Sequence, residues 1–149
     1  MTQNDFQLLN QKALRYLANR EHSRFELRQK LQTTHLDREI IDAVLDNLAD
    51  RGYQSDRRFA ESYTRYRINK GYGELYIRRV LQQRGVSNDI VSVVLAEQAH
   101  VWFDLVCEVQ HKRFTTTPNG QREYAKQVRF LQYRGFTQEQ IRYAFDNTK

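Results

Sequence analysis

The sequence predicts an all-α protein of three tandem three-helix repeats of about 50 residues, which stack into an elongated, curved helical solenoid. Two observations carry this prediction. Good helix formers dominate the composition, and one proline and six glycines among 149 residues leave little room for a turn-rich β fold. Apolar positions also fall into register, without gaps, when the sequence is shifted by 50 residues. We therefore expect one domain over residues 1–149, with repeats at about 5–50, 51–99 and 100–149.

The 50-residue register holds for apolar and for polar positions alike. Leu31, Leu81 and Leu131 align in one apolar column. Each repeat also places a good helix N-cap at a shared position, with an acidic residue two positions later, where its charge meets the positive end of the helix dipole. The other matching positions are Leu9, Phe59 and Val109; Leu36, Val86 and Phe136; Ile41, Val91 and Ile141; Val44, Val94 and Ala144; Leu45, Leu95 and Phe145; and the caps Asp37, Ser87 and Thr137.

Start and stop signals divide each repeat into three helices. Ser23 with Glu26, and Thr137 with Gln140, have the spacing of capping boxes. In repeats two and three an Arg-Gly pair follows the second helix, and glycine suits the left-handed turn that ends a helix. No glycine or proline lies between residues 85 and 118, so the continuity of the sixth and seventh helices stays open. The predicted helices cover residues 5–19, 23–32, 37–50, 55–70, 74–84, 102–114 and 121–134, and two more start at 87 and 137.

The net charge of +6 is concentrated in the middle of the chain. Residues 51–84 hold nine basic and three acidic residues, whereas the remainder holds 15 of each and is neutral. A basic centre between neutral flanks indicates an acidic partner, either nucleic acid or an acidic protein surface. The alternative is that these arginines only solvate a helix face.

The predicted helix over residues 55–70 carries both aromatic and basic side chains. Phe59, Tyr63 and Tyr66 follow helical spacing and form one stripe, whereas Arg58 and Arg65 project from a different face. Guanidinium groups bind carboxylate and phosphate in two-pronged fashion, so an arginine-rich outer face suits either partner. The tyrosines could stack on bases, but their helical spacing favours a place in the core.

Signals for catalysis, metal binding and membrane insertion are poor. No phosphate-loop or nucleophile motif is present, so we predict that the protein is not an enzyme and needs no cofactor. His100, Asp104, Cys107 and His111 share one helical face, but the two histidines lie about 16 Å apart along the axis and cannot share one zinc ion. We expect a solvated face there and no metal. No apolar run approaches the roughly 18 residues of a membrane span, and one cysteine with an N-terminus unlike a signal peptide indicates the cytosol.

Several short and distinct sequence elements are distributed along most of the chain. Residues 56–60 read Asp-Arg-Arg-Phe-Ala, residues 70–73 read Lys-Gly-Tyr-Gly and residues 77–81 read Ile-Arg-Arg-Val-Leu. Residues 23–31 read Ser-Arg-Phe-Glu-Leu-Arg-Gln-Lys-Leu, and Leu131, Arg134-Gly135-Phe136 and Ile141 follow near the C-terminus. Together these elements resemble the RecX family of bacterial recombination regulators. The third repeat departs from the family pattern in its loop at residues 115–120 and at Gln127-Val128.

The resemblance implies nine helices in three repeats and a cytoplasmic regulator of the RecA recombinase. RecX proteins are understood to lie in the groove of the RecA–single-stranded DNA filament and to inhibit the recombinase, ATPase and coprotease activities that serve recombination, DNA repair and the SOS response. We expect a monomer with no membrane partner and with possible direct DNA contact. The alternative is a helical-repeat protein that binds nucleic acid directly through its basic central repeat. The basic surface assigned to the filament or to DNA comprises Arg57, Arg58, Arg65, Arg67, Lys70, Arg78 and Arg79.

Overall fold

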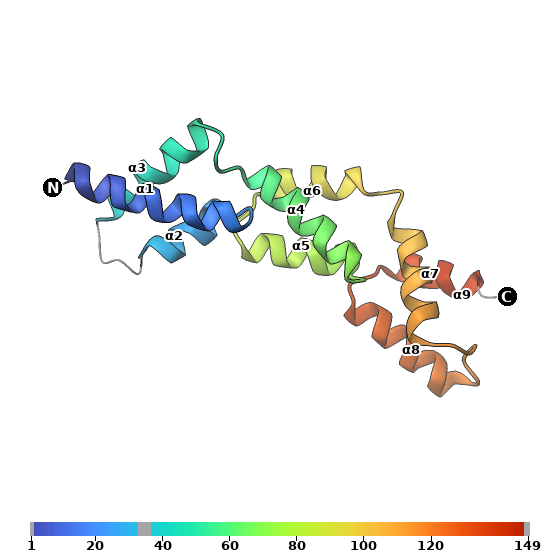
Figure 1. Ribbon diagram of the computed structural model, residues 1–149. Helices are drawn as coiled ribbons and strands as arrows, with labels where there is room; N and C mark the ends of the chain where they lie inside the picture. Colours follow the sequence, from blue (N-terminus) through green and yellow to red (C-terminus); the bar gives the residue numbers. More distant parts are fainter. Residues whose placement is uncertain (1, 33–36, 148–149) are drawn as a thin grey trace. The chain divides into compact units, whose positions relative to one another are not determined.

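The computed structural model of the chain describes residues 2–32 and 37–147 and is all-α over them (Figure 1). These residues form nine helices and no strand, with three helices in each predicted repeat. The predicted all-α architecture of three three-helix repeats is confirmed. The helices are α1 (Thr2–Asn19), α2 (Arg24–Gln32), α3 (Arg38–Asp50), α4 (Asp56–Asn69), α5 (Glu74–Gln83), α6 (Asn88–Glu97), α7 (Trp102–Arg113), α8 (Gln121–Tyr133) and α9 (Gln138–Asp146).

The predicted register reappears as a pattern of burial. Leu31, Leu81 and Leu131 are each 0% exposed, so the same position of all three repeats lies in a core. Full burial of such a side chain stabilises the folded state by about 1.5–3 kcal/mol. Phe145 is only partly buried, and Leu36 lies outside the described residues.

Both predicted capping boxes are present. The Glu26 N–H donates to Ser23 Oγ at 3.1 Å, and the Ser23 N–H donates to Glu26 Oε1 at 3.0 Å. Thr137 and Gln140 make the equivalent pair of bonds at the start of α9, at 3.1 and 2.9 Å. Asp37 accepts a backbone N–H at the start of α3. Each box satisfies N–H groups that the first turn of a helix leaves without intrahelical partners.

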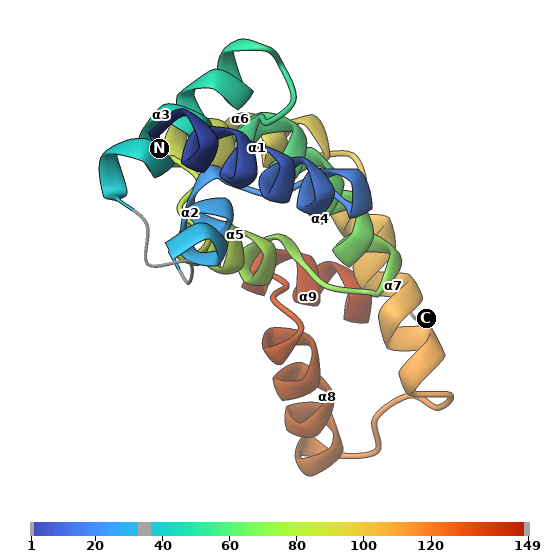
Figure 2. The ribbon, with the colours of Figure 1, turned by 60° about the vertical axis from the view of Figure 1, so that its left-hand side comes forward.

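The chain divides into two compact units, and the division passes through the second repeat rather than between repeats. The first unit comprises residues 1–62 and 81–91, and the second comprises 63–80 and 92–149. In the first unit, α1 packs against α3 and α2. In the second unit, α7 packs against α9, and α8 packs against both (Figure 2). The core of the first unit contains Leu9, Ala13, Leu27, Leu31, Ile41, Val44, Leu45 and Leu48.

Helices α6 and α7, whose continuity the sequence left open, are separate. The break between them bends the chain by 74°. No glycine or proline lies in it, and bonds from Gln98 N–H to the Leu95 carbonyl at 3.1 Å and from Val101 N–H to the Gln98 carbonyl at 2.9 Å close it. Taken singly, none of the described helices is both long and apolar enough to cross a membrane; only this bent pair, counted together, has the required length and composition.

Candidate functional site

The turn between α4 and α5, residues 70–73, docks onto the turn that follows α8. The Gly73 N–H donates to the Arg134 carbonyl at 2.7 Å, and the Leu75 N–H donates to the Gly135 carbonyl at 2.9 Å. A Cβ atom on Gly73 would lie 2.6 Å from the carbonyl carbon and oxygen of Gly135, so only glycine permits this approach. Gly135 has a φ of +96°, the left-handed conformation predicted from the Arg-Gly pair. Backbone contacts therefore fasten the start of α5 to the third repeat.

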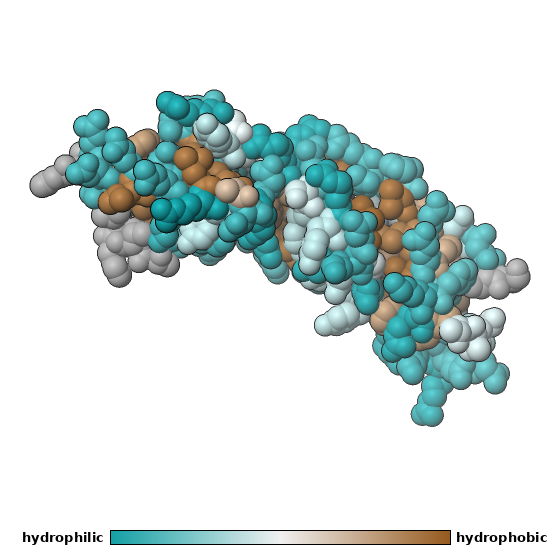
Figure 3. Space-filling model, in the orientation of Figure 1, coloured by the Kyte–Doolittle hydropathy of each residue, from teal (hydrophilic) through white to brown (hydrophobic). Residues whose placement is uncertain are grey.

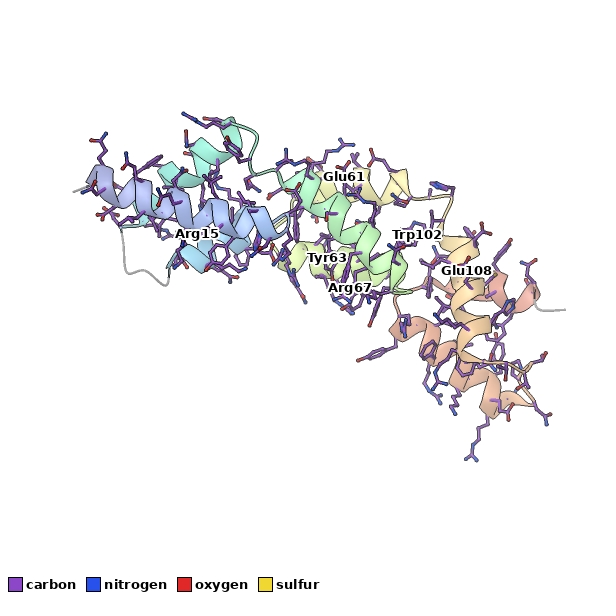
Figure 4. All side chains as sticks on the ribbon, viewed as in Figure 1. Arg15, Glu61, Tyr63, Arg67, Trp102 and Glu108 are labelled. Atoms are coloured by element: carbon purple, nitrogen blue, oxygen red, sulfur yellow. The ribbon has the colours of Figure 1, made fainter. Side chains whose placement is uncertain are left out.

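The docked turn gathers four tyrosines around one guanidinium group. The Cζ atom of Arg67 lies 5.4 Å from the ring centre of Tyr63 and 5.3 Å from that of Tyr66. The same atom lies 5.1 Å from the ring centre of Tyr72 and 5.6 Å from that of Tyr76. Its Nε donates a 2.9 Å hydrogen bond to the Tyr63 hydroxyl, and Figure 4 shows these two side chains next to each other on α4. We call these five residues the arginine–tyrosine cluster; each cation–ring contact of this kind is worth about 0.5–2 kcal/mol.

Positive charge surrounds the cluster. Three further cations, Lys70, Arg79 and Arg134, each lie within 5.7 Å of the ring centre of one of its tyrosines. In the part of the chain that the structure describes, no salt bridge joins any of these cations, or Arg67, to a carboxylate. Burial alone lowers the pKa of Arg67, but the hydrogen bond to Tyr63 and the neighbouring tyrosines outweigh it and raise that pKa. The guanidinium is therefore permanently charged.

A different charged site lies in the first unit, where Glu26 meets two arginines. Its carboxylate forms salt bridges of 3.1 Å to Arg20 and 2.9 Å to Arg84, although Glu26 is only 8% exposed. The hydroxyl of Ser23 also donates to the Arg84 carbonyl at 2.8 Å. Burial alone raises the pKa of the Glu26 carboxyl, but the hydrogen bonds from Arg20 and from the Ser23 N–H outweigh it and hold that pKa below its ordinary value. The site fastens the start of α2 to the end of α5.

His22, beside this site, is buried and neutral. Its Nδ1 lies 3.0 Å from the Arg20 carbonyl oxygen, and its Nε2 lies 2.9 Å from the Lys30 ammonium. Because an ammonium group only donates, Nε2 accepts the bond and Nδ1 carries the proton. Burial lowers the pKa of His22, and together with the charges of Arg20 and Lys30 it outweighs the hydrogen bond to the Arg20 carbonyl, which raises that pKa.

Three family models match the chain, one for each repeat. The first three-helix domain of RecX matches residues 11–48, the second matches 55–95 and the third matches 103–145. The chain belongs to the RecX family.

Curated relatives and solved structures agree with this assignment. Regulatory protein RecX of Vibrio cholerae serotype O1 is 45% identical over 141 residues, which cover 94% of this chain and 93% of the relative. Regulatory protein RecX of Chromohalobacter salexigens is 42% identical over 92% of this chain and 93% of the relative. The crystal structure of RecX from Lactobacillus salivarius superimposes with a TM-score of 0.83 at 21% identity over 96% of both chains. Another crystal structure of a regulatory protein RecX gives 0.84 at 23% identity, over 95% of this chain and 73% of that one. At these identities the structures establish the shared RecX fold.

The seven basic residues assigned from the sequence do not form one group in this RecX chain. Arg67, Lys70 and Arg79 belong to or border the arginine–tyrosine cluster. Arg65 is exposed on α4. Arg78 lines a different cleft, together with residues of α6, α7 and the start of α9. Three of the seven residues thus lie around the same tyrosines, and two lie elsewhere in the second unit.

The two remaining assigned residues lie at the start of α4, in the first unit, and both form ion pairs. Arg57 Nε is 3.3 Å from Glu61 Oε2, and Arg58 Nε is 3.0 Å from Glu21 Oε2. Exposed pairs of this kind contribute about 0.2–1 kcal/mol. Because a carboxylate already offsets their charge, Arg57 and Arg58 are weaker candidates for binding an acidic partner than Arg65.

The sequence did not reveal most of the aromatic part of the cluster. Tyr63 is 9% exposed and buried as predicted, but the prediction of a core position for Tyr66 is wrong, because 53% of it is exposed. Basic side chains, rather than apolar ones, flank its ring. Tyr72 and Arg134 are brought together by the docking of two turns that are far apart in sequence, so no local pattern could reveal their contact. The glycines of those two turns were the available signal.

The potential metal ligands on and before α7 remain separate. His100, Asp104 and His111 are exposed, and Cys107 is partly buried. Among residues 2–32 and 37–147, no group of three or more His, Cys, Asp or Glu side chains could hold a metal ion. Burial, followed by the charges of Asp104 and Glu108, raises the pKa of the Cys107 thiol, so it is not an activated nucleophile at neutral pH.

A cleft of about 580 Å³ adjoins the arginine–tyrosine cluster. The end of α4, one side of α7 and the end of α8 line it. Figure 3 shows hydrophobic residues gathered over α7. The apolar part of the cleft lining comprises Ile68, Val101, Leu105, Val109 and Phe130. Asp104 and Glu108 supply carboxylates. The cleft therefore has mixed charge.

Proposed function

We propose that this chain binds the RecA–single-stranded DNA filament and inhibits the recombinase, ATPase and coprotease activities of RecA. The observation that carries the proposal is that all three repeats match the corresponding RecX domains. Relatives that align over nearly the whole chain are named regulatory proteins, which suits a regulator rather than a catalyst. The positive charge of residues 51–84 suits an acidic filament surface. The protein would act in the cytoplasm, as a monomer.

The inhibition requires no chemistry at a catalytic centre. A filament grows by adding subunits at its end, so one molecule bound there prevents the addition of many further subunits, whereas one molecule bound in the groove covers several subunits that are already present. Three repeats on one chain can each make modest contacts, and these contacts reinforce one another because binding of the first raises the effective concentration of the others.

Charge reversal in the middle repeat tests the proposal. We would combine Arg65→Glu with Arg78→Glu, two residues outside the arginine–tyrosine cluster, and measure binding to preformed filaments. Like charges facing an acidic surface cost several kcal/mol, so we expect affinity to fall about tenfold or more. The matched control combines Lys12→Glu with Arg15→Glu on α1, outside the basic residues 51–84. Figure 4 labels Arg15 on this helix. Equal losses in both double variants, or no loss at Arg65 and Arg78, would contradict the assignment.

Arg58 is less suitable for this test than the sequence suggested. Its reversal would place a new carboxylate beside Glu21, the residue with which it now pairs. A loss of binding would then be difficult to separate from a loss of stability.

The alternative function is direct nucleic-acid binding through the basic middle repeat, which the same concentration of charge favours. The two functions differ in stoichiometry. An inhibitor of filament growth should suppress the DNA-dependent ATPase of RecA at less than one molecule per RecA subunit. Suppression that needs an excess of the protein, and that follows the removal of free DNA, would favour the alternative.

A further inference from the structure

One face of α8 carries a row of basic side chains that ends in a tyrosine. The row lies within the second unit, and its members are Arg122, Lys126, Arg129 and Tyr133. Their spacing along the helix places them all on the same side of it. All four are exposed, whereas the opposite side of α8 is buried against α7 and α9. We call these four residues the α8 stripe.

No carboxylate of the chain offsets the charge of the α8 stripe. Within residues 2–32 and 37–147, no salt bridge joins any of its three cations to an acidic residue. The acidic residue of α8 itself, Glu123, accepts the Asn119 N–H at 2.7 Å instead of a cation. Like charges three and four residues apart destabilise a helix. The neutral composition of the chain outside residues 51–84 hides this one-sided arrangement.

Tyr133, at the end of the α8 stripe, also gains little from the fold. It is 83% exposed, more than any other large hydrophobic side chain of the described residues. Tyrosine and arginine are enriched in protein interfaces, and they often supply much of the binding energy there. A fully exposed tyrosine beside a row of uncompensated cations therefore indicates a surface that meets a partner.

We propose that the α8 stripe binds an acidic helix of a partner protein, which places one carboxylate against each cation and an apolar side chain against Tyr133. Along α8 the successive cations are separated by about 6 Å and then by about 4.5 Å, the rise of four and of three residues. A second helix reproduces these intervals when its carboxylates are also three and four residues apart. Each such contact is a charge-assisted hydrogen bond, and the arginines can form it in two-pronged fashion.

Two other anionic partners fit the α8 stripe less well. The phosphates of a nucleic-acid strand are evenly spaced, so fewer of them match a row of cations with unequal intervals. An anionic membrane holds an amphipathic helix through its apolar face, but the apolar face of α8 is buried within the second unit. An acidic helix has the periodicity of α8 itself, and its apolar side chains can cover the ring of Tyr133.

This inference goes beyond the proposed function, because the α8 stripe shares no residue with the basic surface of the middle repeat. Its test needs no RecA. The matched probe is a fluorescent helical peptide of about 20 residues that carries leucine and, four, seven and eleven residues later, glutamate, for antiparallel docking. A second peptide of the same composition has its glutamates distributed around the helix. We expect the full chain to bind the matched peptide about tenfold more tightly, and this difference to shrink as the salt concentration rises.

Charge reversal on α8 tests the cations of the stripe. Combining Lys126→Glu with Arg129→Glu should weaken binding of the matched peptide about tenfold, because like charges then face each other. The control combines Lys112→Glu with Arg142→Glu, which are exposed residues of α7 and α9 in the same repeat. This control makes the same change in net charge and should weaken binding much less.

The tyrosine of the stripe has a control of its own. Tyr133→Ala should weaken binding of the matched peptide about fivefold. Tyr53→Ala removes another exposed tyrosine, outside the stripe, and should leave binding unchanged. A peptide with lysine in place of each glutamate should bind the double variant of Lys126 and Arg129 more tightly than it binds the original chain. A variant that had merely lost its fold would not show this reversal.

Several outcomes would overturn the inference. These are equal binding of the two acidic peptides, equal losses in the Lys126–Arg129 variant and its control, or no difference between Tyr133→Ala and Tyr53→Ala. An oligothymidylate that binds through Lys126 and Arg129, while the matched peptide does not bind, would identify nucleic acid as the partner instead. Because RecA takes no part in this test, its failure leaves the proposed function standing. A failure of filament binding would likewise leave the assignment of the α8 stripe intact.

Discussion

Neighbouring repeats are joined at two equivalent positions of the 50-residue register, which we call the first and the second junction. The interactions that hold the two junctions together differ. In the first unit the Ser23 hydroxyl donates to the Arg84 carbonyl, and in the second unit the Gly73 N–H donates to the Arg134 carbonyl. Both pairs are related by the 50-residue shift. Each fastens the start of one repeat's second helix to the turn that ends the second helix of the next repeat.

The junctions differ three residues further on. The first has Glu26, which is buried and forms a salt bridge with Arg84. The second has Tyr76 at the matching position, and Arg134 lies instead over the ring of Tyr72. The residue type at one position of the register thus decides whether a junction arginine pairs with a carboxylate inside the fold or has no carboxylate there to pair with. This contrast explains why the basic, aromatic surface lies at the second junction.

Replacing Gly73 with alanine should cause the largest loss of folding stability, because the second junction depends on close backbone contact. The new Cβ would lie 2.6 Å from the carbonyl of Gly135, and the backbone cannot move away without lengthening the bond to Arg134. We expect the free energy of unfolding to fall by about 3 kcal/mol, measured by urea denaturation with circular dichroism.

The control for this prediction is Gly52→Ala. Nothing lies within 4 Å of a Cβ at Gly52, so only its φ of +79° opposes the change. We expect a loss of about 1 kcal/mol there. Equal losses at Gly52 and Gly73 would show that the contact with Gly135 does not hold the second junction.

Removing the charge of Glu26 should cause the next largest loss of folding stability. This loss should come from the first junction alone. Glu26→Gln keeps the shape of the side chain and an oxygen that can accept the Ser23 N–H. The two arginine partners are 46% and 36% exposed and can recover water, so we expect a loss of about 1.5 kcal/mol. The control is Glu61→Gln, which removes an exposed pair and should cost about 0.5 kcal/mol or less. Indistinguishable melting temperatures for the two variants would contradict the buried role of Glu26.

Mild acid should cause the smallest loss of folding stability. It should weaken the first junction, which contains His22 and Glu26, more than the second. The pKa of His22 is lowered from its ordinary value of 6.5, so below that pH the unfolded chain binds a proton more readily than the folded chain. The free energy of unfolding therefore keeps its full value above this pH. It decreases as the pH falls, and at pH 6 the decrease due to His22 is at most about 0.8 kcal/mol. The lowered pKa of Glu26 acts in the same direction below its ordinary 4.5. Hydrogen exchange should show protection falling in α2 more than in α8; an equal fall in both would contradict this.

The sequence by itself determined the repeat. Leu31, Leu81 and Leu131 were aligned by the 50-residue shift and are all buried, and the capping boxes lie where their spacing predicted. The physical reason is that helical periodicity, capping and the needs of a left-handed turn are local properties, expressed within a few residues. The same local reasoning placed positive charge in the middle repeat, because composition alone reveals it.

Only the tertiary structure decided how that charge is arranged and which side chains it contacts. Helical spacing placed Tyr66 in the core, but spacing alone does not show how far along the helix the neighbouring helices pack against it. Tyr66 is exposed, with two cations near its ring. The structure also distinguished Arg58, already paired with Glu21, from Arg67, which is surrounded by tyrosines. Such contacts join residues that are distant along the chain, and their geometry depends on how close two turns can approach. The two turns can approach this closely because Gly73 has no side chain. The need for glycine at this position becomes clear only when Gly135 is seen in contact with it.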